Sequence, residues 1–179
     1  MNYSEIGMLH RINNSLRASP LNRLVGLTPT ISGFTTTPSS PENCTDGNES
    51  NPTGTAEANN VTGVKEYGYF DFDMGAIYNV LITASVKMWA SSAITLYMDI
   101  YYKNAVGDSW VVWYPPDAIS ITASATSEPA TSTKIQNFPL ISCRHIRFSF
   151  KAGARPTGDL AYAKPYEFAA HELKLASTG

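Results

Sequence analysis

Hydrophobic and polar residues alternate along most of the chain from Tyr67 onward. In the first such run, Phe70 and Phe72 fall on one face of a strand, and Asp71 and Asp73 fall on the other. A period of two is typical of a strand with one buried face. Comparable runs follow at residues 77–88, 94–102, 110–114, 119–122, 135–138, 143–150 and 166–175. Because no helical pattern separates these runs, we predict an all-β antiparallel sandwich over residues 65–176.

The same alternation predicts which side chains fill the core of the sandwich. The inward positions are mostly aromatic or branched, as buried strand faces require. The predicted core comprises Phe70, Phe72, Ile82, Leu96, Ile100, Trp110, Ile146, Phe148 and Leu173.

Residues 1–30 follow a helical spacing instead and form a short amphipathic arm. Its apolar stripe comprises Ile6, Leu9, Ile12, Leu16, Leu21 and Leu24, and its basic residues are Arg11, Arg17 and Arg23. So short a helix is marginal alone and needs a surface to lie on. Two interpretations stay open. The arm folds back on its own domain, or it docks on another protein subunit of a larger assembly, which is the interpretation we favour.

Residues 31–64 separate the arm from the predicted sandwich. Residues 35–41 are rich in Thr, Ser and Pro and read as a linker or an extended edge. Residues 43–55 are dense in Asn, Asp, Gly, Ser and Thr, the composition of a structured loop. We expect the loop from about residue 41 to belong to the sandwich.

Four segments, taken in order, carry a resemblance to a known family. Residues 45–50 read TDGNES, residues 69–75 read YFDFDMG, residues 106–110 read VGDSW, and residues 143–148 read CRHIRF with ELKL at 172–175. Together they resemble the discoidin, or coagulation factor 5/8 C-type, family. The resemblance implies a galactose-binding-like jelly-roll sandwich. It does not fix a function, because this fold hosts lectins, lipid binders, adhesion modules and enzyme appendages.

Composition and charge exclude several classes of protein. The chain has 179 residues, of which 43% are hydrophobic and 16% charged, with a net charge of −2. A nucleic-acid binder would show a basic stripe, so we expect no nucleic-acid partner. No run reaches the roughly 18 apolar residues of a membrane helix, so we expect no membrane insertion. No signal peptide is visible at the start of the sequence, which favours free thiols at Cys44 and Cys143, with a Cys44–Cys143 disulfide as the alternative.

A calcium ion is the cofactor that we expect at the Asp46–Asn48 loop. Hard cations prefer carboxylate and carbonyl oxygens, and Gly47 allows a tight turn between the two side chains. The family resemblance implies a structural calcium closed by a glutamate of the last strand. The ligands would then be Asp46, Asn48, Thr53 and Glu172. The alternative is a loop held by Asx-turn hydrogen bonds alone.

A sugar site would combine an aromatic platform with a few hydrogen-bonding groups at one end of the sandwich. The candidates are Trp89, Arg155, Asp159, Tyr162 and Tyr166. Contacts to a neighbouring subunit would explain the same aromatic residues. The histidines, His10, His145 and His171, do not lie at metal-ligand spacing, and we expect no catalytic residues.

These observations favour a non-catalytic structural or binding protein. We expect an accessory head or tail component of a tailed-phage virion that displays the discoidin-like domain, with adsorption to host glycans as one role. Such a protein would reach the virion surface or the extracellular space by lysis, without a signal. The alternative function is a free-standing, calcium-dependent carbohydrate-binding lectin.

Overall fold

The structure is a computed structural model that describes residues 21–59, 65–92, 94–113, 119–123, 127–135, 140–153 and 159–173. Nearly all of the regular structure in these ranges is antiparallel β-sheet, as the alternation predicts. The elements are β1 (Thr30–Ser32), the 3-10 helix η1 (Pro41–Thr45), β2 (Ala56–Asn59), β3 (Lys65–Ala90), β4 (Ile94–Lys103), β5 (Val111–Val112), β6 (Ile119–Ala123), β7 (Thr133–Ile135), β8 (Ile141–Ala152) and β9 (Leu160–Glu172).

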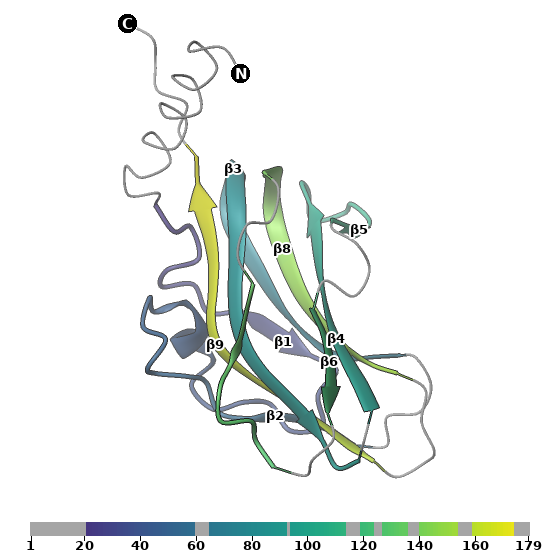
Figure 1. The fold of residues 1–179 in the computed structure, drawn as a ribbon. Helices are drawn as coiled ribbons and strands as arrows, with labels where there is room; N and C mark the ends of the chain where they lie inside the picture. Colours follow the sequence, from purple (N-terminus) through teal and green to yellow (C-terminus); the bar gives the residue numbers. More distant parts are fainter. Residues whose placement is uncertain are drawn as a thin grey trace, which may run out of the picture.

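The long strand β3 belongs to both layers of the sandwich. Its first part pairs with β1 and β8, and β8 pairs in turn with β4, which carries β5 and β6. Its second part pairs with β9 and β7, and β9 pairs with β2. Figure 1 shows β9 beside β3 on one side, with β8 and β4 on the other. Gly75, at φ 80°, lies where the β3–β8 register shifts, in a backbone conformation that favours glycine.

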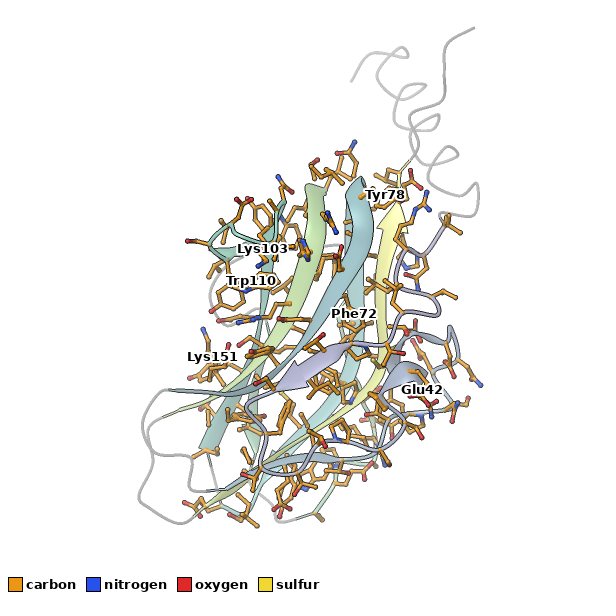
Figure 2. All side chains as sticks on the ribbon, turned by 180° about the vertical axis from the view of Figure 1, so that it is seen from behind. Glu42, Phe72, Tyr78, Lys103, Trp110 and Lys151 are labelled. Carbon is orange, nitrogen blue, oxygen red and sulfur yellow. The ribbon has the colours of Figure 1, made fainter. Side chains whose placement is uncertain are left out.

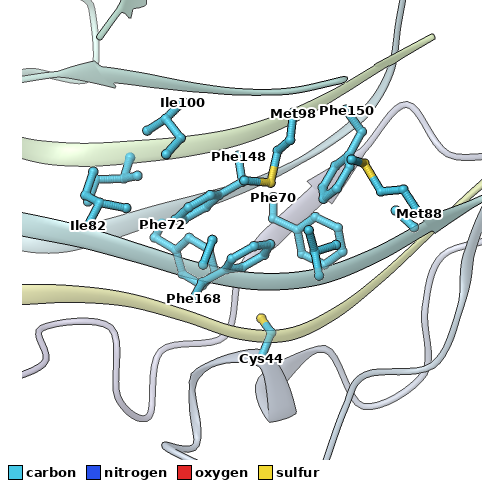
Figure 3. Close-up of a cluster of buried hydrophobic side chains, with 14 of the residues drawn as sticks. Cys44, Phe70, Phe72, Ile82, Met88, Met98, Ile100, Phe148, Phe150 and Phe168 are labelled. Atoms are coloured by element: carbon cyan, nitrogen blue, oxygen red, sulfur yellow. The ribbon is translucent and has the colours of Figure 1, made fainter. Parts of the chain in front are cut away.

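Phenylalanine rings from both layers fill the space between the sheets. Phe148 of β8 and Phe168 of β9 stack with ring centroids 3.9 Å apart and planes 7° apart, which joins the two layers directly. Figure 3 shows these rings with Met88, Met98 and Ile100 around them. Of the predicted core residues, the buried ones are Phe70, Phe72, Ile82, Leu96, Ile100, Ile146 and Phe148.

Trp110 and Leu173 are partly exposed, so their placement in the core is wrong. Trp110 lies between β4 and β5, where its ring covers charged side chains on the outer face of the sheet. An indole ring can cover ion pairs as well as pack in a core, because its face attracts cations. Leu173 follows the last residue of β9, where the sheet no longer covers it.

The end of the predicted arm packs on its own domain. Leu24 is fully buried in the core, and the Asn22 side chain accepts a hydrogen bond from the Ala170 N–H of β9. Arg23 pairs with Glu172 at the end of the same strand. Burial of Leu24 on another subunit is therefore wrong for this part of the stripe, since the chain's own sheets cover it. The arm residues Ile6, Leu9, Ile12, Leu16, Arg11 and Arg17 lie outside the described residues.

Part of the predicted linker contributes to the sheets. β1 pairs with β3 and β2 pairs with β9, so strands from residues 31–59 extend both layers. Cys44 of η1 and Cys143 of β8 are both buried free thiols, as expected. Within the described ranges, no helix is long and apolar enough to cross a membrane.

Candidate functional site

Trp89 of β3 and Tyr162 of β9 lie directly opposite one another on the outer face of their layer. Their rings stack, with centroids 5.1 Å apart and planes 15° apart. Trp89 is only 8% exposed, whereas Tyr162 is half-buried and reaches the surface. Burial and the nearby Glu57 carboxylate raise the pKa of the Tyr162 hydroxyl. The pair therefore forms a fixed aromatic surface with its tyrosine accessible.

Polar groups lie beside this aromatic pair, where β3 ends and β9 begins. The Ser91 hydroxyl donates to the Asp159 carboxylate at 3.2 Å and accepts from the Leu160 N–H at 2.8 Å. The Ser91 N–H also donates to the Leu160 carbonyl oxygen. These bonds fix the Asp159 carboxylate at the end of the strand pair that carries Trp89 and Tyr162.

The next outward-facing pair of residues along β3 and β9 is basic. Lys87 of β3 lies opposite Lys164 of β9, and both ammonium groups donate to the Glu128 carboxylate, at 3.0 Å and 3.2 Å. Contacts with the Tyr166 hydroxyl and with Glu128 raise the pKa of Lys87. Burial alone would raise the pKa of Glu128, but hydrogen bonds from Lys87 and Lys164 outweigh it and hold that pKa below its ordinary value.

Tyr166 lies on this face at a bulge in β9. The β3–β9 register shifts between Ser85 and Val86, which pair with Glu167 and Pro165. The extra residue is Tyr166, whose ring lies 5.0 Å from the Lys87 Nζ and whose hydroxyl donates to Glu128 at 3.4 Å. The bulge reverses the alternation of β9, so that Phe168 points into the core although Tyr162 and Lys164 point outward. Proline is tolerated at a bulge because the ladder is interrupted there and needs no donor.

The structure thus brings the described sugar-site candidates to one region of the molecule. Trp89, Asp159, Tyr162 and Tyr166 all lie on or beside the outer face of the β3–β9 strand pair, which we call the β3–β9 face and which also carries Lys87 and Lys164. Arg155 lies outside the described residues. Sequence reasoning missed Lys87, Lys164 and Glu128. The alternation of β9 could have placed Lys164 between the tyrosines, but only the strand register sets Lys87 opposite it.

The outer face of the other layer carries a different arrangement. Arg147 of β8 makes two hydrogen bonds to Asp71 of β3, and its guanidinium lies 3.6 Å from the Tyr69 ring centroid and 4.4 Å from that of Trp110. Figure 2 shows Trp110 close to Lys103 on this side of the molecule. The Lys103 Nζ lies 4.8 Å from the same Trp110 ring. Cations therefore already occupy these aromatic faces.

The remaining charges of that layer pair across neighbouring strands. Lys151 of β8 pairs with Asp99 of β4, and Ser149 donates to Glu66 of β3. Asp99 and Ser149 are fully buried although they point away from the core. Arg147 and Lys151 each meet a carboxylate of the adjacent strand, and Lys103 donates to the Val106 carbonyl oxygen, so these contacts stabilise the sheet. The β3–β9 face is therefore the better candidate for a binding site.

The Asp46–Asn48 loop lies beside Glu167, whereas Glu172 pairs with Arg23. The Asp46 carboxylate accepts from the Asn48 N–H at 2.7 Å and from the Asn51 side chain at 2.8 Å, which is an Asx-turn arrangement. The Gly47 N–H donates to Glu167 at 3.2 Å. The Thr53 hydroxyl donates to a backbone carbonyl.

The Glu167 carboxylate lies near two other carboxylates, those of Asp46 and Glu49. Burial, followed by the charges of Asp46 and Glu49, raises its pKa to about 7. In the part of the chain that the structure describes, no three His, Cys, Asp or Glu side chains lie together as a ready metal site. If a calcium ion binds at this loop, the carboxylates that lie beside it are those of Asp46 and Glu167, and carbonyl oxygens or water would complete its shell.

Known proteins resemble this chain in fold but not in sequence. No known protein family and no curated protein matches the sequence. Among solved structures, a variant of chitosan-binding module 1 from a chitosanase/glucanase of Paenibacillus sp. IK-5 is similar, with 16% identity and a TM-score of 0.51 over 85% of this chain and 98% of that one. CBM32-3 from a family 31 glycoside hydrolase of Clostridium perfringens is 11% identical, with a TM-score of 0.49 over 87% and 96%.

A fucose-binding module of Streptococcus pneumoniae is 14% identical, with a TM-score of 0.45 over 87% of this chain and 97% of that one. The chain shares the fold of the chitosan-binding module, which is the galactose-binding-like sandwich that is also found in discoidin domains. The expected fold is thus confirmed. The identities are too low to transfer a ligand or a site.

Proposed function

We propose that this chain is a non-catalytic glycan-binding module that binds an oligosaccharide on the β3–β9 face. The observation that carries the proposal is the stacked Trp89–Tyr162 pair with Asp159 at its edge and Tyr166 further along the same strand. Sugars present flat C–H faces and hydroxyl edges, so they pack on aromatic rings and bond to a few fixed polar groups.

The spacing of the tyrosines favours a ligand longer than a single sugar. Tyr162 and Tyr166 are four positions apart on β9, and a strand rises about 3.3 Å per residue, so their Cα atoms lie about 13 Å apart. One sugar ring cannot contact both side chains. The Lys87–Lys164 row lies between them and supplies donors for the hydroxyl or acidic groups of a chain that runs along the strand.

Glycan binding is the activity named for the chitosan-binding module, whose fold this chain shares. We extend only the general class, glycan binding, to this chain. Display on a phage virion, docking of the arm on protein subunits and the location of the protein stay predictions.

A glycan array followed by affinity electrophoresis tests the proposal. We expect the full chain to bind at least one oligosaccharide, and Tyr162→Ala to weaken that binding about tenfold, which corresponds to about 1.4 kcal/mol. Tyr97→Ala is the matched control, because Tyr97 is a half-buried tyrosine of β4 in the other layer. Thermal melting of each variant verifies that it is folded. Absence of binding to every glycan, or equal losses in both variants, would overturn the proposal.

A further inference from the structure

Lys87 and Lys164 form an unusual cross-strand pair. They lie directly opposite one another on β3 and β9, and like charges in such positions destabilise a sheet. Among the described residues, Glu128 is the carboxylate that bonds to both. On the other layer, by contrast, Arg147 and Lys151 each pair with a separate carboxylate on a neighbouring strand. The β3–β9 face therefore places two cations around a single anion.

Glu128 reaches the lysines from outside the strand pair. It lies in the segment before β7, and its side chain is 33% exposed, whereas Lys87 and Lys164 are 11% and 22% exposed. The carboxylate therefore covers the lysines on their solvent side. Tyr166 also contacts this carboxylate, and the Trp89–Tyr162 stack begins one outward row further on. Two ammonium groups that bond to one carboxylate make strong, charge-assisted hydrogen bonds, which could equally hold the carboxylate of an acidic sugar.

We propose that the β3–β9 face binds a uronate-containing polysaccharide, whose carboxylate takes the place of the Glu128 carboxylate between Lys87 and Lys164. This inference rests on the proposed function and names its ligand class. Glu128 acts as an internal counter-ion that keeps the lysines in place when no ligand is bound. The sugar ring packs beside Tyr162 or Tyr166 while its carboxylate exchanges with that of Glu128.

If the Glu128 carboxylate competes with the ligand carboxylate for the two lysines, removing the Glu128 charge has an effect that general attraction to positive charge does not predict. If Glu128 occupies the ligand's position, its neutral isostere leaves both lysines available, so Glu128→Gln should bind the ligand more tightly. If Glu128 only supports the sheet, the same change weakens binding or leaves it unchanged. Lys87→Gln and Lys164→Gln should both weaken binding, because each removes one of the donors to the ligand carboxylate.

The probes are polygalacturonate and neutral galactan, each used in affinity electrophoresis with the full chain. We expect polygalacturonate binding to fall about tenfold in Lys87→Gln and in Lys164→Gln, and to rise about threefold to fivefold in Glu128→Gln. Lys103→Gln is the matched control, since it removes the same charge from the other layer and should bind as the unaltered protein does. Thermal melting of each variant checks its folding.

The outcomes separate this inference from the proposed function. Binding of galactan that depends on Tyr162, without binding of polygalacturonate, would leave glycan binding in place and overturn the acidic ligand. An equal loss of polygalacturonate binding in Lys103→Gln would indicate general charge attraction and overturn the site. Weaker or unchanged binding in a folded Glu128→Gln would overturn the role of Glu128 as a counter-ion in the ligand's place.

Discussion

Arg147 on β8 and Asp71 on β3 form a bidentate ion pair across the two strands, with N–O distances of 2.7 Å and 2.8 Å. The pair lies under the rings of Tyr69 and Trp110, and its side chains are only 16% and 22% exposed. Arg144 and Asp73 form a second pair with the same geometry, both distances being 2.7 Å. That pair is 35% and 43% exposed. The two pairs thus differ in how much water reaches them and in the two rings that cover the Arg147 pair.

Arg147→Ala should lower the free energy of unfolding by about 2–3 kcal/mol, because it leaves the Asp71 carboxylate partly buried without its main partner. Arg147→Lys should recover only part of this loss, since an ammonium group cannot donate the paired hydrogen bonds of a guanidinium. Urea denaturation measures both effects.

Arg144→Ala is the control for this prediction. The hydrogen bond from Arg144 holds the pKa of Asp73 below its ordinary value, but water screens an exposed pair. We expect a loss of at most about 1 kcal/mol. Equal losses in Arg144→Ala and Arg147→Ala would contradict the importance of burial.

Leu24→Ala should destabilise the protein by about 2–5 kcal/mol, because Leu24 is fully buried in the core and its truncation leaves a cavity. Leu21 lies three positions earlier and is 53% exposed, so Leu21→Ala should change stability by no more than about 0.5 kcal/mol. Thermal or urea unfolding compares the two. Deleting residues 1–27 removes Leu24 and the Arg23–Glu172 pair and should be as damaging. A stable protein after that deletion would show that Leu24 is dispensable.

Alternation along the strands was enough to predict the sandwich, but not where its last strand begins. The predicted last strand begins at residue 166, whereas β9 begins at Leu160. Residues 160–165 lack a clear strand pattern because they contain Pro165 and small inward residues, Ala161 and Ala163, where a strand usually has branched ones. Both alanines are nevertheless fully buried in the core. Trp110 was wrongly predicted in the core. Alternation along a strand does not distinguish a core position from an outer-face position that covers other side chains, as Trp110 covers Arg147.

The candidate site was only partly predictable because its contacts span distant parts of the chain. Trp89 and Tyr162 could be recognised as loop-end aromatic residues, yet their stacking depends on the β3–β9 register. Glu128 contacts lysines 36 and 41 positions away, and no local pattern links them. Glu172 was predicted beside Asp46, but the structure places Glu167 there, five residues earlier on β9, which only the packing of η1 against that strand determines.

Glu167 should make stability fall as the pH rises toward neutrality. Its pKa is raised from an ordinary 4.5 to about 7, so between these values the folded protein retains a proton that the unfolded chain has lost. The stabilisation is complete below about pH 4.5 and is lost as the pH passes 7. The loss amounts to at most about 3 kcal/mol.

Glu167→Gln isolates this effect, because glutamine does not titrate. Burial lowers the pKa of His145, which makes stability rise with pH in part of the same range. Both proteins contain His145, so the difference in their melting temperatures cancels it. We expect the advantage of the unaltered protein over Glu167→Gln to shrink from pH 4.5 to pH 7.5 in calcium-free buffer. A difference that stays constant with pH would show that Glu167 titrates normally.

Calcium should reverse that decline if it binds at the Asp46–Asn48 loop. The ion attracts the ionised form of Glu167, so it competes with the proton and should raise the melting temperature most at pH values above 7. At about a hundred times its Kd, calcium would add about 2.7 kcal/mol to the free energy of unfolding, and a chelator would remove that gain.

Substitutions of acidic residues decide which glutamate is the ligand. Asp46→Asn and Glu167→Gln should abolish the response to calcium, because each removes a charge beside the loop. Glu172→Gln should lower the melting temperature by the same amount with and without calcium, since the Glu172 carboxylate pairs with Arg23. Loss of the calcium response in Glu172→Gln alone would restore the ligand set predicted from the sequence. A melting temperature that neither calcium nor chelator moves would mean that Asx-turn hydrogen bonds alone hold the loop.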